Sequence, residues 1–143
     1  MSNTIYGSLA VIYYDDEDGR QFLVVKNKKT GNYTLVGGAC EEGEDFVKSL
    51  QREITEELGL SNGVTDIVEL PIVHKFVFNQ KKTERTDQKG EYHLFSIEFE
   101  QKHEEFNHNE IDRVLWLPFS IVVETLTFPD QVEVFREARE FME

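Results

Sequence analysis

The sequence predicts an α/β fold in which helices cover a mixed β-sheet. Three observations indicate this class. Segments rich in Val, Ile, Leu and aromatic residues, which are typical of strands, recur along the chain. The segment 45–58 instead repeats apolar residues at helical spacing. Strand-like and helix-like segments interleave without regular alternation, and this order indicates a mixed sheet sandwiched by helices.

The composition is that of a folded, acidic protein about the size of one domain. Its 143 residues are 39% hydrophobic and include eleven Phe, enough for one good core. No repeat, low-complexity tract or linker rich in Pro and Gly interrupts the chain, so we expect one domain over residues 1–143. The net charge of −13 disfavours non-specific binding to DNA, RNA or an anionic membrane. An anionic substrate is still compatible with this charge where a metal ion inverts the local field.

The cysteine content and the absence of a targeting segment predict a cytoplasmic protein. Cys40 is the single cysteine, which excludes an internal disulfide. Met1–Ala10 carry no signal-peptide pattern. The longest apolar runs, such as Leu117–Val123, are far shorter than the ~20 residues that a membrane-spanning helix needs.

Three strands are expected in the first part of the chain. Thr4–Tyr14 and Gln21–Lys26 are rich in β-branched and aromatic residues, and the acidic segment 15–19 between them contains the Asp-Gly of a hairpin turn. A calcium-binding loop is the alternative for this acidic segment, but Tyr14 stands where the EF-hand motif requires an Asp. Asn32–Val36 then forms a short third strand.

Residues 45–58 have the clearest helical period of the chain. Asp45 can cap the first turn, and Gly59 suits the left-handed conformation that ends many helices. The apolar residues of this segment fall on one face of the helix: Phe46, Val47, Leu50, Ile54 and Leu58.

The second half of the chain predicts three more strands and two helices. Pro129-Asp130 supplies a start signal for the last helix. The expected strands are Asp66–Phe78, Tyr92–Phe99 and Arg113–Leu117, and the expected helices are Phe119–Leu126 and Asp130–Met142.

Three carboxylates of the helix at 45–58 lie at or inside its apolar face. At ~100° per residue, Glu57 falls within that face, Glu53 at its edge and Glu56 next to Glu53. Two carboxylates ~5 Å apart at an effective dielectric of ~20 repel by roughly 3 kcal/mol, and desolvation adds several more. Arg52 can reach Glu56 but cannot neutralise three acids. The pattern therefore predicts a site for Mg²⁺ or Mn²⁺, with a solvated acidic face as the alternative.

A longer motif surrounds these carboxylates. Gly38 is followed after five residues by Glu44, and after seven more by the Arg-Glu pair at 52 and 53. An apolar residue, the Glu-Glu pair at 56 and 57, a Gly at 59 and an apolar residue at 60 complete the motif. These are all the fixed positions of the Nudix box, and the chain resembles the Nudix hydrolase family. The resemblance implies a Nudix-type α/β/α sandwich with a central mixed β-sheet, and an enzyme that hydrolyses a diphosphate linkage with divalent metal ions.

The resemblance also implies a role for each residue that matches the motif. The ligands of Mg²⁺ or Mn²⁺ would be Glu53, Glu56 and Glu57, helped by a backbone carbonyl of Gly37 or Gly38. Arg52 would orient a glutamate through a salt bridge. Glu44 would brace the loop against the helix.

The general base of such a reaction stays open. Glu53 or Glu56 could take the proton of the attacking water. Glu110, six residues before Trp116, lies where some similar proteins place such a residue, and it is the candidate base outside the box. Four other glutamates compete with it: Glu98, Glu100, Glu104 and Glu105. A solvated surface position is the alternative for each of these five.

The segments outside the box say less about the substrate. Lys75 stands where an ADP-ribose subgroup of the family has a Pro, and Val77 where a dinucleoside polyphosphate subgroup has a Tyr. Asp130 follows Phe128 and Pro129 in a region where a base-reading Asn would be expected. We therefore expect cleavage of a phosphoanhydride bond in a nucleoside diphosphate-linked compound, with a nucleoside triphosphate pyrophosphohydrolase as the first candidate. ADP-ribose, nucleotide sugars and dinucleoside polyphosphates are the alternative substrates, and a non-catalytic nucleotide-sensing or regulatory module is the alternative function.

The expected partner is a small-molecule nucleotide, with no DNA or membrane partner, and the protein is expected to be a monomer or a homodimer. A stretch of basic residues at 80–90 could fold over substrate phosphates as a lid, or form a solvated loop. It contains Lys81, Lys82, Arg85 and Lys89. His74 and His93 alternate with apolar residues, so we expect both to be structural.

Overall fold

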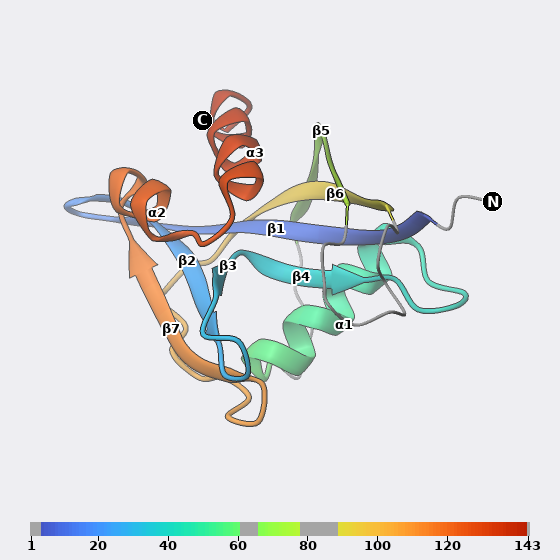
Figure 1. The fold of residues 1–143 in the computed structure, drawn as a ribbon. Helices are drawn as coiled ribbons and strands as arrows, with labels where there is room; N and C mark the ends of the chain where they lie inside the picture. Colours follow the sequence, from blue (N-terminus) through green and yellow to red (C-terminus); the bar gives the residue numbers. More distant parts are fainter. Residues whose placement is uncertain (1–3, 61–65, 78–88, 143) are drawn as a thin grey trace.

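The computed structural model describes residues 4–60, 66–77 and 89–142 (Figure 1). Its strands are β1 (Thr4–Asp16), β2 (Gly19–Asn27), β3 (Tyr33–Thr34), β4 (Val36–Ala39), β5 (Ile67–Val77), β6 (Lys89–Glu98) and β7 (Ile111–Leu117). Its helices are α1 (Phe46–Leu58), α2 (Phe119–Thr125) and α3 (Pro129–Glu140). In Figure 1, α1 lies on one side of the strands, and α2 and α3 lie on the other. The predicted α/β fold with a central mixed sheet is confirmed.

The sheet has the strand order β3-β2-β1-β6-β5, with β4 paired to β1 and β7 paired to β2. Strand β1 runs parallel to β6 along its length and antiparallel to β2 and β4. A sheet that contains both kinds of pairing is mixed, as expected. The antiparallel register of β1 and β4 sets Ser8 opposite Gly38 and Leu9 opposite Gly37.

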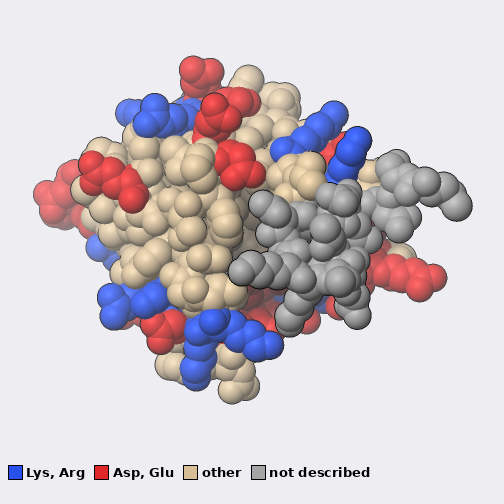
Figure 2. Space-filling view, in the orientation of Figure 1, with Lys and Arg blue, Asp and Glu red and all other residues tan. Residues whose placement is uncertain are grey.

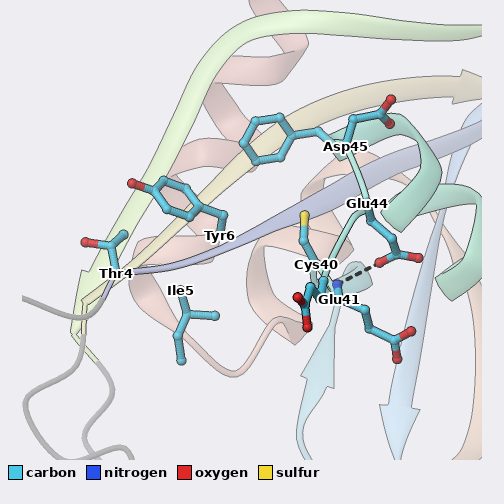
Figure 3. Close-up of a pocket in the computed structure, with 9 residues that line it drawn as sticks. Thr4, Ile5, Tyr6, Cys40, Glu41, Glu44 and Asp45 are labelled. Carbon is cyan, nitrogen blue, oxygen red and sulfur yellow. Dashed lines mark hydrogen bonds between the residues drawn. The ribbon is translucent and has the colours of Figure 1, made fainter.

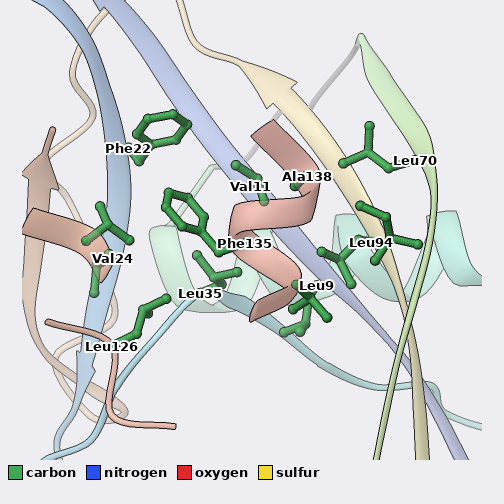
Figure 4. Packing of buried hydrophobic residues seen from close by; sticks show 13 residues of the cluster. Leu9, Val11, Phe22, Val24, Leu35, Leu70, Leu94, Leu126, Phe135 and Ala138 are labelled. Carbon is green, nitrogen blue, oxygen red and sulfur yellow. The ribbon is translucent and has the colours of Figure 1, made fainter. Parts of the chain in front are cut away.

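Alternate residues of β1 enter two separate hydrophobic cores. Leu9 and Val11 belong to the core that contains Phe135 of α3 (Figure 4). Ala10 and Ile12 belong to the other core, with side chains of α1. Because successive side chains of a strand point to opposite faces, the apolar run in β1 can serve both faces at once.

Helix α1 begins and ends as its sequence predicts. The Asp45 side chain accepts a hydrogen bond from the backbone N–H of Lys48 at 2.8 Å. Gly59 adopts the left-handed conformation with φ of 67°, and its N–H donates to the Thr55 carbonyl at 3.0 Å. Asp45 and Gly59 therefore fix the length of the helix that carries the box glutamates.

One residue that was predicted to lie on the buried, apolar face of α1 is exposed in the structure. Val47 lies in the first turn and is 39% exposed, whereas Ser49 is fully buried. The buried side of the helix is thus rotated away from Val47, and it is centred on Leu50, Ile54 and Leu58. The helical wheel treats every turn alike, but the core covers the first turn of α1 less than the later ones.

The predicted strand at 32–36 is divided in the structure. Its first part, β3, pairs with β2, and its second part, β4, pairs with β1. Between them the buried Leu35 donates its N–H to the Gln131 side chain of α3 at 2.9 Å. The basic stretch proposed as a lid lies outside the described residues, except for Lys89 and Gly90.

The two histidines expected to be structural make packing contacts. His74 of β5 is buried, and its Nε2 lies 2.7 Å from a carboxylate oxygen of Asp130 at the start of α3. The ring of His93 of β6 stacks on Phe46 of α1, with the ring centroids 3.8 Å apart. Each histidine therefore links the sheet to one of the helices.

Charged side chains of both signs share the surface of the molecule. On the face shown in Figure 2, Lys and Arg lie in separate groups among Asp and Glu. In the described ranges, none of the helices has the length and apolarity that crossing a membrane requires.

Candidate active site

Two glycines bring the end of β4 close to both β1 and α1. A Cβ atom on Gly37, whose φ is +154°, would lie 2.0 Å from the Ser8 carbonyl oxygen. A Cβ atom on Gly38 would lie 2.5 Å from Oε1 of Glu53. Both distances are too short for a side chain. Glycine at position 37 therefore lets β4 lie close to β1, and glycine at position 38 lets the carboxylate of Glu53 lie directly against the backbone of β4.

Arg52 connects the loop before α1 with the helix itself. Its guanidinium donates twice to Glu44, at 2.7 Å from Nε and 3.1 Å from Nη2. Nη2 also donates to the backbone carbonyl of Ala39 at 2.9 Å. Nη1 donates to Glu53 at 3.1 Å and to Glu56 at 3.2 Å. Because the planar guanidinium has a fixed set of donors, these contacts hold the loop and two glutamates in one arrangement.

Glu44 also bonds to the backbone of the loop that precedes α1. Its Oε1 accepts the backbone N–H of Glu41 at 2.7 Å (Figure 3). The hydrogen bond from Arg52, and then the one from the Glu41 backbone, hold the pKa of Glu44 below its ordinary value. The outer side of the loop borders an open hollow of about 620 Å³ that is lined by residues 4–6, 40–42 and 44–46.

Glu53 and Glu57 are carboxylates in a desolvated environment. Burial raises the pKa of Glu57 to about 8, and the charges of Glu53 and Glu110 add to the shift. Burial likewise raises the pKa of Glu53 to about 7, although the adjacent Arg52 opposes the shift. A hydrogen bond from the Gly37 backbone favours the ionised form of Glu57. Its Oε2 is buried and has no hydrogen-bond partner among the described residues.

These groups suit a hard divalent cation. Within the described segments, no neighbouring positive charge is strong enough to keep the carboxylates of Glu57 and Glu53 fully ionised near neutral pH. A bound cation would supply that charge. Glu56 is 47% exposed and faces solvent beside them. In the part of the chain that the structure describes, no group of three or more Asp, Glu, His or Cys side chains lies close enough together to hold a metal ion. Mg²⁺ usually keeps several waters and is bound through one or two carboxylates together with substrate phosphates.

Glu110 lies near the glutamates of α1, unlike two of its competitors. Its negative charge is among the causes that raise the pKa values of both Glu53 and Glu57. Glu98 and Glu100 instead line a separate hollow of about 260 Å³, together with residues 13, 66, 68 and 96. The other two competitors, at 104 and 105, are exposed. The structure thus brings Glu110 into the electrostatic surroundings of the box.

Two residues of the segment between β6 and β7 contact the end of α1, although neither is among the predicted site residues. The backbone N–H of Asn107 donates to the Glu57 carbonyl at 2.8 Å. Nε2 of His103 lies 2.5 Å from the Leu58 carbonyl. Both contacts join residues about 45–50 positions apart in the chain. No local pattern in the sequence signals such long-range contacts.

Solved structures with a similar fold include proteins of different activity. A protein described as a NUDIX hydrolase from Listeria monocytogenes is 18% identical, with 94% of this chain and 92% of that chain covered and a TM-score of 0.79. The NUDIX domain of Shewanella oneidensis NrtR, solved with ADP ribose, is 16% identical, with 100% and 91% covered and a TM-score of 0.77. The E. coli dihydroneopterin triphosphate pyrophosphohydrolase is 18% identical, with 91% and 93% covered and a TM-score of 0.74. At these identities the similarity shows the fold alone.

The sequence itself gives the family. No curated protein matches this chain by sequence. The model of the NUDIX domain, however, matches residues 6–138, which include the box and all the helices and strands from β2 to α2. This chain therefore belongs to the NUDIX domain family.

Proposed function

We propose that this protein is a metal-dependent hydrolase that cleaves a phosphoanhydride bond in a nucleoside diphosphate-linked compound. A nucleoside triphosphate pyrophosphohydrolase is the first candidate activity. The observation that carries the proposal is the buried, unpartnered Oε2 of Glu57 beside the desolvated Glu53 and the backbone of Gly37 and Gly38. An unpaired buried carboxylate is costly in a protein, and a bound cation offsets that cost.

The proposed ligands of Mg²⁺ or Mn²⁺ are the box carboxylates and a carbonyl of the glycine pair: Glu53, Glu56, Glu57, and Gly37 or Gly38. When bound, such an ion neutralises substrate phosphates, polarises the P–O bonds and lowers the pKa of a water molecule. Arg52 orients Glu53 and Glu56 toward the substrate, because its Nη1 bonds to both. Glu44 supports this arrangement through its two bonds to Arg52.

Hydrolysis requires a group that accepts a proton from the attacking water. We assign this role to the Glu110 carboxylate, whose charge acts on both Glu53 and Glu57. The water oxygen bonds to phosphorus in line with the bridging oxygen, and its proton passes to Glu110. The bond from phosphorus to the bridging oxygen then breaks, and the leaving group departs with a phosphate.

A non-catalytic sensing or regulatory module is the second candidate function. It is favoured by the fold similarity to the NUDIX domain of NrtR, a domain solved with ADP ribose. The complete set of box acids in this chain favours catalysis instead. ADP-ribose, nucleotide sugars and dinucleoside polyphosphates remain the alternative substrates of a hydrolase.

A hydrolysis screen tests the proposal. The purified protein is incubated with nucleoside triphosphates, ADP-ribose, nucleotide sugars and dinucleoside polyphosphates, with Mg²⁺, with Mn²⁺ or with EDTA, and the products are identified by mass. We expect turnover with either metal and none with EDTA. The products should be pyrophosphate and a nucleoside monophosphate, or a nucleoside monophosphate and a second phosphorylated compound.

A pair of variants identifies the residues responsible. Glu57→Gln should lose nearly all activity, whereas Glu137→Gln, at an exposed position on α3, should keep it. Normal turnover by Glu57→Gln would reject the metal site. Tight nucleotide binding without hydrolysis under any metal would favour the sensing module. The cytoplasmic location, the single domain and the monomeric or dimeric state stay predictions.

A further inference from the structure

The segment between β6 and β7 supplies hydrogen bonds to the end of α1 that the helix cannot make itself. The last carbonyls of an α-helix have no partner within the helix. Here the Glu57 carbonyl accepts from the backbone N–H of Asn107 at 2.8 Å, and the Leu58 carbonyl accepts from His103 Nε2 at 2.5 Å. A carbonyl can only accept, so Nε2 of His103 carries the hydrogen. The end of the acidic helix is therefore attached directly to this segment.

Asn107 also organises the turn that leads to Glu110. Its side-chain Oδ1 accepts the backbone N–H of Asn109 at 3.0 Å. Its carbonyl oxygen accepts the N–H of Glu110 at 3.1 Å and that of Ile111 at 2.9 Å. An asparagine side chain that bonds to the backbone two residues later is a recognised way to fix a turn. Through its main chain, the same residue is bonded to Glu57.

Glu110 is held from its other side as well. The backbone N–H of Lys28 donates to the Glu110 carbonyl at 2.9 Å, and Lys28 Nζ donates to the His108 carbonyl at 2.9 Å. Two parts of the chain thus fix the backbone of Glu110. Of the described residues in these contacts, only Asn107 is also hydrogen-bonded to α1, through the carbonyl of Glu57.

We propose that Asn107 is a positioning residue that holds Glu110 beside the glutamates of α1. This inference rests on the proposed function, in which Glu110 accepts the proton of the attacking water. Asn107 contacts neither substrate nor water in this scheme. It acts because one residue bonds to the Glu57 backbone on one side and folds the turn to Glu110 on the other.

Three substitutions test the side chain of Asn107. Asn107→Ala removes the acceptor that fixes the turn, and Asn107→Ser keeps an uncharged acceptor at that position. Asn109→Ala is the matched control, because this exposed neighbour contributes its backbone N–H and the substitution leaves that group in place. We expect Asn107→Ala to lower kcat about fivefold with KM unchanged, which corresponds to one lost hydrogen bond. Asn107→Ser should regain most of the loss, and Asn109→Ala should match the wild type.

A double-mutant cycle with Glu110→Gln separates positioning from a general loss of stability. If Asn107 acts through Glu110, Asn107→Ala should lower kcat in the wild type but not in the Glu110→Gln protein. Equal losses in both backgrounds would overturn the proposal, and so would an Asn107→Ala variant with the kcat of the wild type. Urea denaturation of each variant checks that it is folded.

Amide hydrogen exchange supplies a readout that does not depend on activity. In the metal-free protein, Asn107→Ala should speed exchange at the N–H of Asn109, which loses its side-chain acceptor, and at the N–H of Glu110, whose turn is no longer fixed by that side chain. Unchanged exchange at both positions would refute the role of this side chain in the turn. A wild type that hydrolyses none of the compounds would reject the proposed function itself. An active wild type with an additive double-mutant cycle would reject the positioning role alone.

Discussion

Glu57→Gln should make the metal-free protein more stable at neutral pH, although the same change should remove the proposed activity. The carboxyl group of Glu57 has a pKa of about 8 in the folded chain, against an ordinary value of 4.5. Burial is the largest cause of this difference. Glutamine has almost the same shape, keeps an oxygen for the Gly37 N–H and never carries a charge.

The size of the effect follows from the two pKa values. Between pH 4.5 and about 8 the folded protein retains a proton on Glu57 that the unfolded chain has lost. The free energy of unfolding therefore falls by about 1.4 kcal/mol for each pH unit in this window. At pH 7 the free energy of unfolding of the wild type is therefore roughly 3 kcal/mol lower than at pH 4.5 because of this group. The buried amide of the variant is still an unpaired polar group, which costs part of this difference. We therefore expect the free energy of unfolding of Glu57→Gln to exceed that of the wild type by roughly 1–3 kcal/mol at pH 7.

Urea denaturation in EDTA at several pH values between 4.5 and 8 measures this gain. The difference between Glu57→Gln and the wild type should be small at pH 4.5, where both side chains are neutral in the folded state, and should grow as the pH rises. Added Mg²⁺ should stabilise the wild type and not the variant. Glu137→Gln, an exposed glutamate on α3, should stay within about 0.5 kcal/mol of the wild type throughout. A Glu57→Gln protein that is no more stable than the wild type at pH 8 would refute the reasoning.

Three further substitutions test the structure around the box. Arg52→Ala removes the bonds to Glu44 and leaves carboxylates without their cation, so it should lower the free energy of unfolding measured by urea denaturation. Gly37→Ala places a Cβ 2.0 Å from the Ser8 carbonyl, so it should abolish activity in the hydrolysis screen and lower the thermal midpoint. Asp45→Ala removes the cap of α1 and should cost about 1 kcal/mol in urea denaturation; a loss below about 0.3 kcal/mol would show that this cap does not limit stability.

Local patterns predicted the parts of the molecule that local forces determine. The helix at 46–58 was identifiable because its cap, its period and its terminal Gly59 all lie within one short segment. The division of the strand at 32–36 was missed, because it depends on Leu35 bonding to Gln131, a residue 96 positions away. Val47 was placed on the buried face for a related reason, since periodicity shows which side of a helix is apolar but not how far the core extends along it.

The candidate site shows the same division between local and long-range information. The spacing of the box predicts a role for Glu53, Glu56 and Glu57, which stays a prediction, and the burial of Glu57 agrees with its place on the helical wheel. Glu110 could be named only through family resemblance, and Asn107 not at all. Their positions depend on a chain segment that returns to α1 after two strands, and periodicity and motif spacing contain no information about such contacts.

The alternating side chains of β1 also determine where the site can form. A slip of β1 by one residue against its neighbours would send the side chains of each core to the opposite face of the sheet. The same slip would move Gly37 away from Leu9, and with it the backbone that lies against the glutamates of α1. The packing of the two apolar cores thus fixes the register of β1, and with it the position of a polar site that belongs to neither core. The geometry of the proposed metal site is therefore set in part by apolar residues that lie in the two cores.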